Sequence, residues 1–272
     1  MKEYLSLVET VLKTGSLKNN RTGTDTISAF GMHYKIDLSI GYPLLTTKKV
    51  FFNSVIRELL WYLSGETHIR NLRKHTKIWD AWTSKEKNWE VGKMYGYQWV
   101  KWEKYIEDPK TNKISKTFIN QIDDVINEIK KNPNSRRLVV TAWNPSVLDD
   151  IALPSCHSLF IFNVLNGKLN CHLTQRSGDI ALGIPFNLAC YATLTQMIAQ
   201  ETNLKLGTFS HYVNDAHIYV NHIDGLKKQL ERKPLPLPKL KIKSKPFWDL
   251  KFDDFILSNY NHHDVIKFDV AV

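Results

Sequence analysis

Hydrophobic residues recur every three to four positions in several segments, which is the spacing of one face of an α-helix. These segments are residues 3–13, 55–63, 118–131 and a longer one that starts at Pro185. Gly65 follows the second segment and Asn132-Pro133 follows the third, so each of these two helices has a stop signal. The segment after Pro185 is apolar around most of its circumference, which predicts a helix at the centre of the core.

Other segments are rich in β-branched and aromatic residues and are expected to form strands. They cover residues 26–40, 137–143, 159–165 and 169–175. The last two are joined through Asn166-Gly167, the strongest short-range sign of a hairpin turn, so we expect them to pair antiparallel. Pro234, Pro236 and Pro238 mark a later loop.

No repeat, low-complexity tract or linker separates these elements. We therefore expect residues 1–272 to form a single domain of the α+β class, with a mixed or antiparallel sheet packed against helices. The chain is 43% hydrophobic and 24% charged, which excludes an intrinsically disordered or fibrous protein.

An excess of positive charge indicates an anionic partner. Lys and Arg number 37 against 27 Asp and Glu, which gives a formal net charge of +10. Nucleic acid, a membrane surface and a phosphorylated small molecule all fit this charge. The three cysteines have no CxxC spacing, so neither a disulfide framework nor a cysteine metal site is expected. Without a signal-peptide pattern or an apolar run near ~20 residues, the predicted location is the cytoplasm.

Cys156-His157 lies in a predicted loop just before the strand 159–165. A thiolate is a strong nucleophile, and it forms near neutral pH when a cationic group is close. Arg176 lies about as far after the hairpin turn as Cys156 lies before it, so antiparallel pairing makes the two residues neighbours. On its own, Cys156 is better interpreted as a small core residue until a cationic partner is found, and a solvated strand end is as good an interpretation of Arg176 as a functional one.

Further polar residues suit a phosphorylated pyrimidine. Arg21, Arg136, Arg137 and Arg176 supply guanidinium groups that together can hold one doubly charged phosphate. Asn187, just inside the apolar helix, offers the paired donor and acceptor that read a pyrimidine edge. The alternatives are a solvated surface for the arginine pair and a first-turn residue bonded to the backbone for the amide.

Three more side chains have two interpretations each. His217 and Tyr219 alternate on a predicted strand, either pointing together at a shared hydroxyl or following ordinary strand patterning. Glu58 lies opposite the apolar stripe of its helix, beside Trp61 and Tyr62. It is therefore either a solvent-exposed carboxylate or a buried proton carrier.

Taken together, these residues resemble the thymidylate synthase family along nearly the whole chain. The matching motifs are residues 21–24, 43–49, 58–61, 78–82, 95–99, 135–137, 156–157, 175–179, 182–187 and 215–219. The resemblance implies methylation of dUMP to dTMP, with 5,10-methylenetetrahydrofolate supplying the carbon and a hydride and leaving as dihydrofolate. It also implies a homodimer formed through one face of the sheet, and no metal.

The resemblance assigns a role to each matching residue. Cys156 would attack C6 of the uracil, and Arg176 would help to form its thiolate and bind the phosphate. Glu58 would organise the water network that moves protons, and Tyr95 would lie near the proton that leaves C5. Asn187 would hold the N3 and O4 edge of the uracil.

The remaining implied contacts hold the rest of the two substrates. His217 and Tyr219 would bind the ribose hydroxyl. The phosphate would contact Arg21, Arg176, Ser177 and, from the partner subunit, Arg136 and Arg137. The folate would contact Ile78, Trp79, Trp82, Gly183, Phe186 and Val272, with Asp179 bonding the pterin and Lys48 near the glutamate tail.

The chain departs from the family pattern at two positions. Ser155 stands directly before Cys156, where the family usually has Pro. Asn214 stands where the family usually has Gly, and Asn is one of the few other residues that tolerate a positive φ. Neither change removes a functional group.

The nearest alternative is a hydroxymethylase of the same fold, in which water attacks the exocyclic methylene. Asn187 argues against a cytosine substrate, because the similar cytosine enzymes carry Asp at that position. Trp79 and the apolar residues 270–272 argue against hydroxymethylation, because they would keep water out.

Nucleic-acid binding is an alternative from another class. The lysine-rich residues 239–245, the pair Lys130-Lys131 and the 11% aromatic content motivate it. No zinc-finger spacing, RNP-type motif or helix-turn-helix pattern accompanies them, so it ranks below the enzyme.

Overall fold

Six strands form a mixed sheet at the centre of the computed structural model, which describes residues 1–271. In their order across the sheet they are β1 (Ser16–Lys18), β2 (Thr26–Asp37), β8 (Lys205–Tyr219), β7 (Lys168–Asp179), β6 (His157–Leu165) and β5 (Val139–Thr141). All neighbours pair antiparallel except β7 and β8, which are parallel. The carboxyl ends of β7 and β8 therefore meet at one edge of the sheet.

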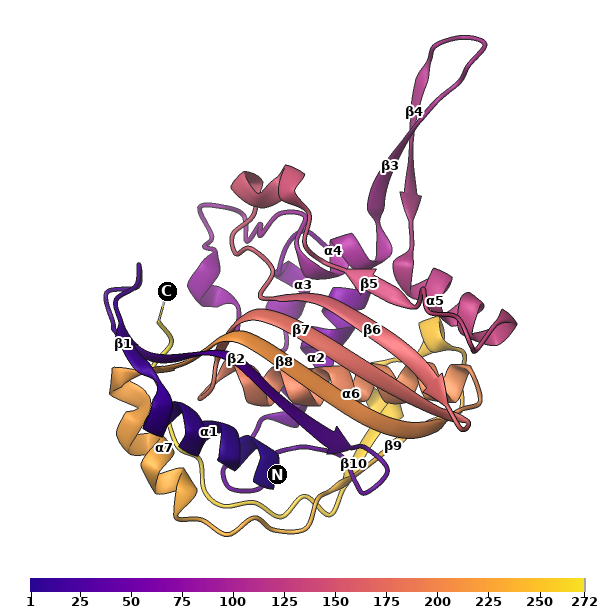
Figure 1. Cartoon of the computed structure of the whole chain (residues 1–272). Coiled ribbons are helices and arrows are strands. Elements are labelled where there is room, and N and C mark those ends of the chain that lie inside the picture. The colour runs from indigo at the N-terminus through magenta and orange to yellow at the C-terminus, as the bar shows by residue number, and fades with distance from the viewer. Residues whose placement is uncertain (272) are drawn as a thin grey trace.

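Two helices, α6 (Gly183–Glu201) and α2 (Phe52–Ser64), lie behind the sheet in the view of Figure 1. The side chains of Leu188, Tyr191 and Leu194 on α6 are fully buried, because nearly the whole circumference of this helix is apolar. The predicted central helix and the α+β class, with a mixed sheet packed against helices, are both confirmed.

The remaining elements surround this core. The other helices are α1 (Lys2–Thr14), α3 (Arg70–Arg73), α4 (Tyr95–Val100), α5 (Gln121–Lys131) and α7 (Ile223–Leu230). Short 3₁₀ turns lie at Asp80–Trp82, Pro145–Asp150, Val220–His222, Phe247–Asp249 and Phe252–Asp254. Two strands, β9 (Lys239–Ile242) and β10 (Phe255–Ser258), form a small separate antiparallel pair.

Local sequence patterns fix several element boundaries. Gly65 adopts φ 62° at the end of α2, where the missing side chain allows the left-handed conformation that stops a helix. Asn166 (φ 51°) and Gly167 (φ 70°) join β6 and β7, which confirms the predicted hairpin. The predicted strands over 26–40 and 137–143 are present but shorter, as β2 and β5.

The helix predicted over residues 118–131 is wrong at its start. Phe118 and Ile119 end a strand, β4 (Ile114–Ile119), and α5 begins only at Gln121. The Asn120 side chain accepts hydrogen bonds from the backbone N–H groups of Ile122 and Asp123, so it caps the helix at this point. The helix therefore begins after Asn120, although the helical spacing of hydrophobic residues extends back to Phe118 and Ile119.

Among the described residues, β4 pairs only with β3 (Trp102–Glu107), and the sequence patterns did not predict this hairpin. Figure 1 shows it projecting from the body of the molecule. Tyr105 and Ile114 are 60% and 70% exposed, because neither face of the hairpin packs against the core.

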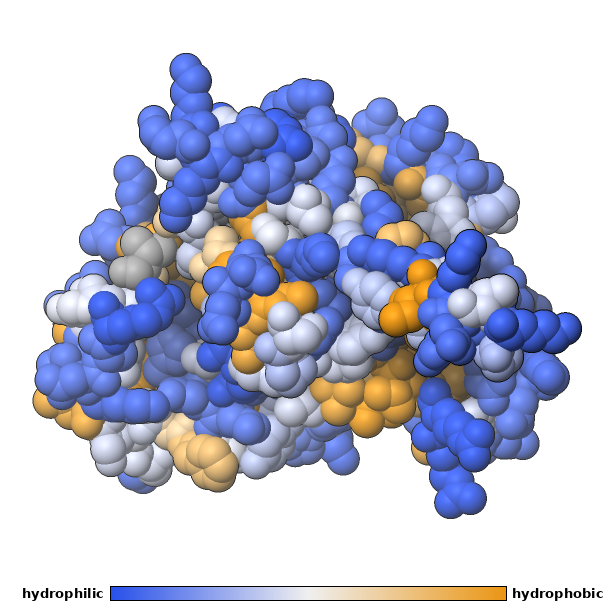
Figure 2. Space-filling model, turned by 90° about the horizontal axis from the view of Figure 1, so that it is seen from above, coloured by the Kyte–Doolittle hydropathy of each residue, from blue (hydrophilic) through white to orange (hydrophobic). Residues whose placement is uncertain are grey.

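The surface seen from above in Figure 2 is mostly hydrophilic, with hydrophobic side chains in small separate areas. Within residues 1–271, no helix combines the length and the apolar character needed to cross a membrane.

Candidate active site

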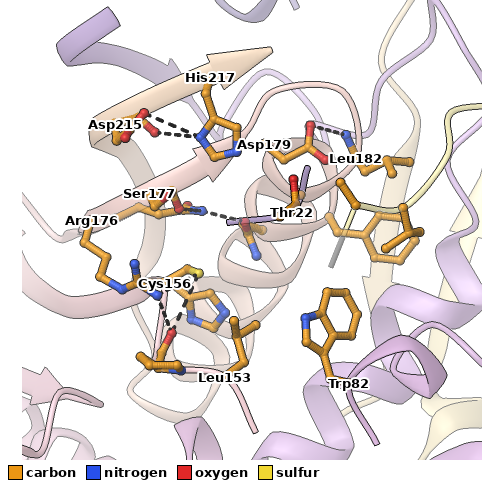
Figure 3. A pocket seen from close by; sticks show the side chains of 18 of the residues that line it. Thr22, Trp82, Leu153, Cys156, Arg176, Ser177, Asp179, Leu182, Asp215 and His217 are labelled. Carbon is orange, nitrogen blue, oxygen red and sulfur yellow. Dashed lines mark hydrogen bonds and ion pairs between the residues drawn. The ribbon is translucent and has the colours of Figure 1, made fainter. Parts of the chain in front are cut away.

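A cavity of about 650 Å³ opens where β7 and β8 end and α6 begins. Most of the residues singled out in the sequence line it, although they come from distant parts of the chain. The lining includes Arg21, Glu58, Ile78, Trp79, Trp82, Tyr95, Cys156, Arg176, Ser177, Asp179, Gly183, Phe186, Asn187, His217 and Tyr219. Figure 3 shows part of this wall, with Cys156 and Arg176 on one side and Trp82 across from them.

Cys156 and Arg176 are neighbours, as the counting along the hairpin predicted. The backbone N–H of Arg176 donates to the carbonyl of Cys156 at 2.8 Å, and its Nη2 lies 3.5 Å from the Cys156 Sγ. The same guanidinium donates to the carbonyls of Pro154 and Ser155, at 2.6 and 3.1 Å, so three groups fix its position. A fixed cation therefore lies beside a half-buried thiol.

Tyr95 lies on the other side of the Cys156 backbone. Its phenol oxygen accepts a hydrogen bond from the Cys156 N–H at 2.8 Å, and its ring stacks on His157 with 4.0 Å between centroids. Burial, together with the nearby thiol, raises the pKa of Tyr95 well above its usual value, so the phenol keeps its proton. Tyr95 has φ 28°, and Gly96 follows it because a Cβ there would lie 1.8 Å from the Tyr62 carbonyl.

Glu58 is buried, which excludes the solvent-exposed interpretation. Only 7% of the residue is exposed, and its Oε1 accepts a hydrogen bond from Trp79 Nε1 at 2.7 Å. Burial raises the pKa of Glu58 to about 7, against which the Trp79 hydrogen bond acts only in part. A carboxyl group that is half protonated near neutral pH can both give and take a proton.

The parallel pairing of β7 and β8 builds the polar end of the cavity. Asp179 lies opposite His217, and Ser177 lies opposite Asp215, so polar residues of both strands face the same space. The rings of His217 and Tyr219 are 5.3 Å apart, and both residues line the cavity.

Asn187 lines the cavity from the first turns of α6. Its Oδ1 accepts a hydrogen bond from Gln175 Nε2 at 3.0 Å, and the same Nε2 donates to the Ser177 carbonyl at 2.9 Å. The amide of Asn187 is therefore held by a second amide rather than by the helix backbone. Asp179 Oδ1 accepts hydrogen bonds from the N–H groups of Ala181 and Leu182 just before this helix.

Aromatic and apolar groups form the opposite wall. The rings of Trp79 and Trp82 lie 5.1 Å apart, and Val270 and Ala271 of the C-terminal segment line the cavity beside them. The carbonyl of Asp269 is bonded to His222 Nε2 at 2.8 Å, so the segment is anchored just before it reaches the cavity.

Not every predicted site residue lies at the cavity. Lys48 is buried, and its Nζ donates to the Ala181 carbonyl behind the cavity wall. Burial lowers the pKa of Lys48 to about 8. Arg136 and Arg137 are exposed between α5 and β5, and neither contributes to the cavity of its own chain. Val272 lies outside the described residues.

Other observations correct or extend the sequence analysis. Asn214 lies in β8 without a positive φ, so its tolerance of that conformation is not used. Arg176 does not end the hairpin strand, because β7 continues to Asp179. Sequence reasoning gave no role to Gln175 or His157, although Gln175 lies inside a matching motif and His157 follows Cys156 directly.

The described residues hold no group of three or more His, Cys, Asp or Glu side chains that could bind a metal ion. A protein-family model described as thymidylate synthase matches residues 2–272. Enzymes of this family are one-carbon transferases that methylate dUMP and use methylenetetrahydrofolate as co-substrate. Because the match extends over almost its full length, this chain belongs to the thymidylate synthase family.

Proposed function

We propose that this chain converts dUMP to dTMP with 5,10-methylenetetrahydrofolate, which supplies the carbon and a hydride and leaves as dihydrofolate. The whole chain, residues 1–272, acts as one catalytic domain. The contact between Cys156 Sγ and Arg176 Nη2, inside a cavity with one polar and one aromatic wall, is the observation that carries this proposal.

The Cys156 thiolate attacks C6 of the uracil and turns C5 into a nucleophile. Arg176 supports this step, because its positive charge lies beside the sulfur and stabilises the thiolate. The C5 centre then takes up the one-carbon unit and must lose its proton. Tyr95 is the residue that we place at this proton, because its phenol oxygen lies against the backbone of the nucleophile.

Glu58 manages the other proton transfers. Its pKa near 7 suits an acid and base that works at neutral pH, and its place in the lining gives it access to the substrate space through water. The hydrogen bond from Trp79 fixes the carboxyl without neutralising it.

The polar wall binds dUMP. Asn187 reads N3 and O4 of the uracil, while His217 and Tyr219 hold the ribose hydroxyl. Arg21, Arg176 and Ser177 bind the phosphate, for which bidentate guanidinium groups are well suited. Arg136 and Arg137 complete the phosphate site from a second copy of the chain, because they are exposed and do not line the cavity of their own chain.

A homodimer formed through the uncovered face of the sheet would deliver these two arginines. In Figure 1, α6 and α2 both lie behind the sheet. On the opposite face, His172, Thr174 and Tyr212 are only half-buried, and Phe30 is 84% exposed. Such a mixed apolar and polar face is suitable for pairing with a second copy of itself.

The aromatic wall suits the folate. Ile78, Trp79, Trp82, Gly183 and Phe186 offer flat and apolar surface to the pterin and the benzoyl ring, and Asp179 offers an acceptor to the pterin. We assign to Val272, which lies outside the described residues, the closing of the site, and to Lys48 a place near the glutamate tail. Lys48 does not line the described cavity.

An assay with dUMP and methylenetetrahydrofolate tests the proposal. We expect dihydrofolate, followed by its absorbance, and dTMP, identified by mass. Hydroxymethylated nucleotide without dihydrofolate would replace the proposal with the hydroxymethylase. The buried Trp79, 5% exposed, and the docked Val270 and Ala271 favour hydride transfer, because they limit the access of water to the reacting carbon.

A further inference from the structure

A chain of hydrogen bonds crosses the inner face of the sheet and ends at the amide of Asn187. It begins at Tyr34 on β2, whose hydroxyl lies 2.7 Å from Nδ1 of its register partner His211 on β8. His211 Nε2 lies 2.9 Å from Gln175 Oε1 on β7. Gln175 Nε2 then donates to Asn187 Oδ1 on α6 at 3.0 Å. The hydrogen bonds thus run across the three adjacent strands β2, β8 and β7 to α6 at the cavity.

Each hydrogen bond in this chain has only one possible direction. Gln175 Nε2 also bonds the Ser177 carbonyl, which can only accept, so this atom is the amino end of the Gln175 side chain. The other end, Oε1, is an acceptor, so His211 must carry its proton on Nε2. His211 Nδ1 then has a free lone pair, and the Tyr34 hydroxyl must donate to it.

Burial keeps the chain in this state. Tyr34 is 7% exposed, Gln175 is 2% exposed and His211 is not exposed at all. Burial, with the nearby rings of His172 and His33, lowers the pKa of His211 to about 3, so the imidazole is neutral. A protonated imidazole would donate from both nitrogens and would break the order of the chain.

The consequence is felt at Asn187. Its Oδ1 is turned to Gln175, and within residues 1–271 no protein group accepts a hydrogen bond from its amino group. This amide therefore offers a donor to the base, and that donor matches the O4 carbonyl of uracil. Cytosine has an amino group at the same place, so two donors would oppose each other.

We propose that Tyr34 and His211 are positioning residues that fix the orientation of the Asn187 amide and so favour uracil over cytosine nucleotides. The inference rests on the proposed function, since it takes dUMP as the substrate. Neither residue lines the cavity, and both act only through Gln175.

Tyr34→Phe tests this role, because it removes one hydroxyl and keeps the shape of the ring. Without the phenol donor, His211 can move its proton to Nδ1 and accept from Gln175. The Gln175 amide then turns over at the expense of its hydrogen bond to the Ser177 carbonyl, and the Asn187 amide follows it. We expect the ratio of the dCMP to the dUMP dissociation constant, measured by calorimetry, to fall by about tenfold.

Tyr42→Phe is the matched control. Tyr42 is also buried, and its hydroxyl bonds the Ala189 carbonyl and Thr193 Oγ1, so its loss has a similar cost in stability. This variant should keep the wild-type ratio. An unchanged ratio in Tyr34→Phe, or the same fall in both variants, would overturn the inference. A wild-type protein that does not bind dUMP would instead overturn the proposed function.

The tautomer of His211 gives a test in the unaltered protein. The ¹⁵N chemical shifts of labelled histidine distinguish a ring protonated at Nε2 from one protonated at Nδ1. We expect the Nε2–H form at neutral pH, with its proton bonded to Gln175. An Nδ1–H form would refute the inference, and this result does not depend on whether any variant folds.

Discussion

Burial sets the protonation states of a carboxyl group and a phenol at the centre of the site. Glu58, with a pKa near 7, lies in the same cavity as a thiol that has the guanidinium of Arg176 beside it. Tyr95 keeps its proton because it is buried next to that thiol. At neutral pH one cavity thus holds a carboxyl group near its pKa and a phenol that stays protonated.

Replacing Cys156 by Ser tests the nucleophile. A serine hydroxyl ionises far less readily than a thiol, so turnover should fall by at least about 10³-fold, while dUMP binding stays close to normal. Dihydrofolate formation and calorimetric titration with dUMP measure the two effects. Cys171→Ala is the control, since Cys171 is buried in β7 away from the cavity and should leave turnover nearly unchanged. Near-normal turnover in Cys156→Ser would remove this residue as the nucleophile.

Glu58→Gln tests the raised pKa through stability. The folded protein binds the Glu58 proton more tightly than the unfolded chain, with pKa values of about 7 and 4.5. The free energy of unfolding of the parent protein should therefore fall by up to about 3 kcal/mol as the pH rises through this window. Glu58→Gln has no carboxyl group to titrate here, so its free energy of unfolding should not show this fall. Urea unfolding at pH 5 and pH 7.5 measures this effect. The free energy of unfolding of the variant, relative to that of the parent protein, should be higher at pH 7.5 than at pH 5.

Glu201→Gln serves as the comparison for Glu58→Gln. A hydrogen bond from the Lys130 ammonium lowers the pKa of Glu201, so its carboxylate is favoured in the folded state. The free energy of unfolding of this variant, relative to that of the parent protein, should not increase as the pH rises from 5 to 7.5. Equal behaviour of the two variants would mean that Glu58 is not the source of the pH dependence.

At the scale of elements, the site depends on how closely α4 approaches α2. Tyr95 and Gly96 begin α4, and the Tyr62 carbonyl of α2 lies where a Gly96 Cβ would be. This contact presses the start of α4 against the core and directs the Tyr95 ring toward Cys156. Packing between two helices thus sets the place of the Tyr95 side chain in the cavity.

Gly96→Ala should disturb both stability and activity. A Cβ 1.8 Å from a backbone oxygen forces the two helices apart, which should cost at least about 3 kcal/mol of unfolding free energy. Gly167→Ala is the control, because nothing lies within 4 Å of that Cβ and only its φ of 70° is unfavourable, at about 1 kcal/mol. If urea unfolding gives the two variants the same loss, the helix contact is not as tight as described.

Sequence patterns predicted the elements that depend on neighbours in the chain. Asn166-Gly167 placed the hairpin, and the hairpin in turn placed Cys156 beside Arg176. Gly65 marked the end of α2. Each of these inferences needs only local geometry, because turn conformation and strand pairing follow from a few adjacent residues.

Features that depend on distant segments were missed or left open. The burial of Glu58 requires Trp79, which comes from a loop outside its helix and is invisible to helical periodicity. The contact of His211 with Tyr34 and Gln175 requires the register of three strands. The hairpin of β3 and β4 was missed because its residues pack on no core and so lack a one-sided hydrophobic pattern.

For the whole molecule, the arginines outside the cavity raise the question of whether one chain is sufficient to form the proposed phosphate site. Arg21 and Arg176 line the cavity, whereas Arg136 and Arg137 lie elsewhere on the surface. A site completed by a second chain explains this separation and predicts that two different defects can complement each other.

Mixing Arg136→Ala with Cys156→Ser tests the shared site, provided that each variant is poor alone. A hybrid dimer has one site with both an intact Cys156 and an intact partner arginine. After denaturation and joint refolding, roughly a quarter of wild-type activity should return. The two variants refolded separately and then combined briefly are the control. No recovery after joint refolding would count against a site built from two chains.

The pairing of β2 with β8 also determines at what point during synthesis the sheet and its cavity can form. Ser28 and Asp215 are hydrogen-bonded although 187 residues separate them. At ~5–20 residues per second, a ribosome needs roughly 10–40 s to add that length, and β2 has no partner on this side during that time. Arg21 and Cys156 are likewise synthesised well before His217 and Tyr219, which line the same cavity. The nascent chain therefore lacks part of this cavity until most of it has been made, and an unpaired strand edge during that time is open to pairing with other chains.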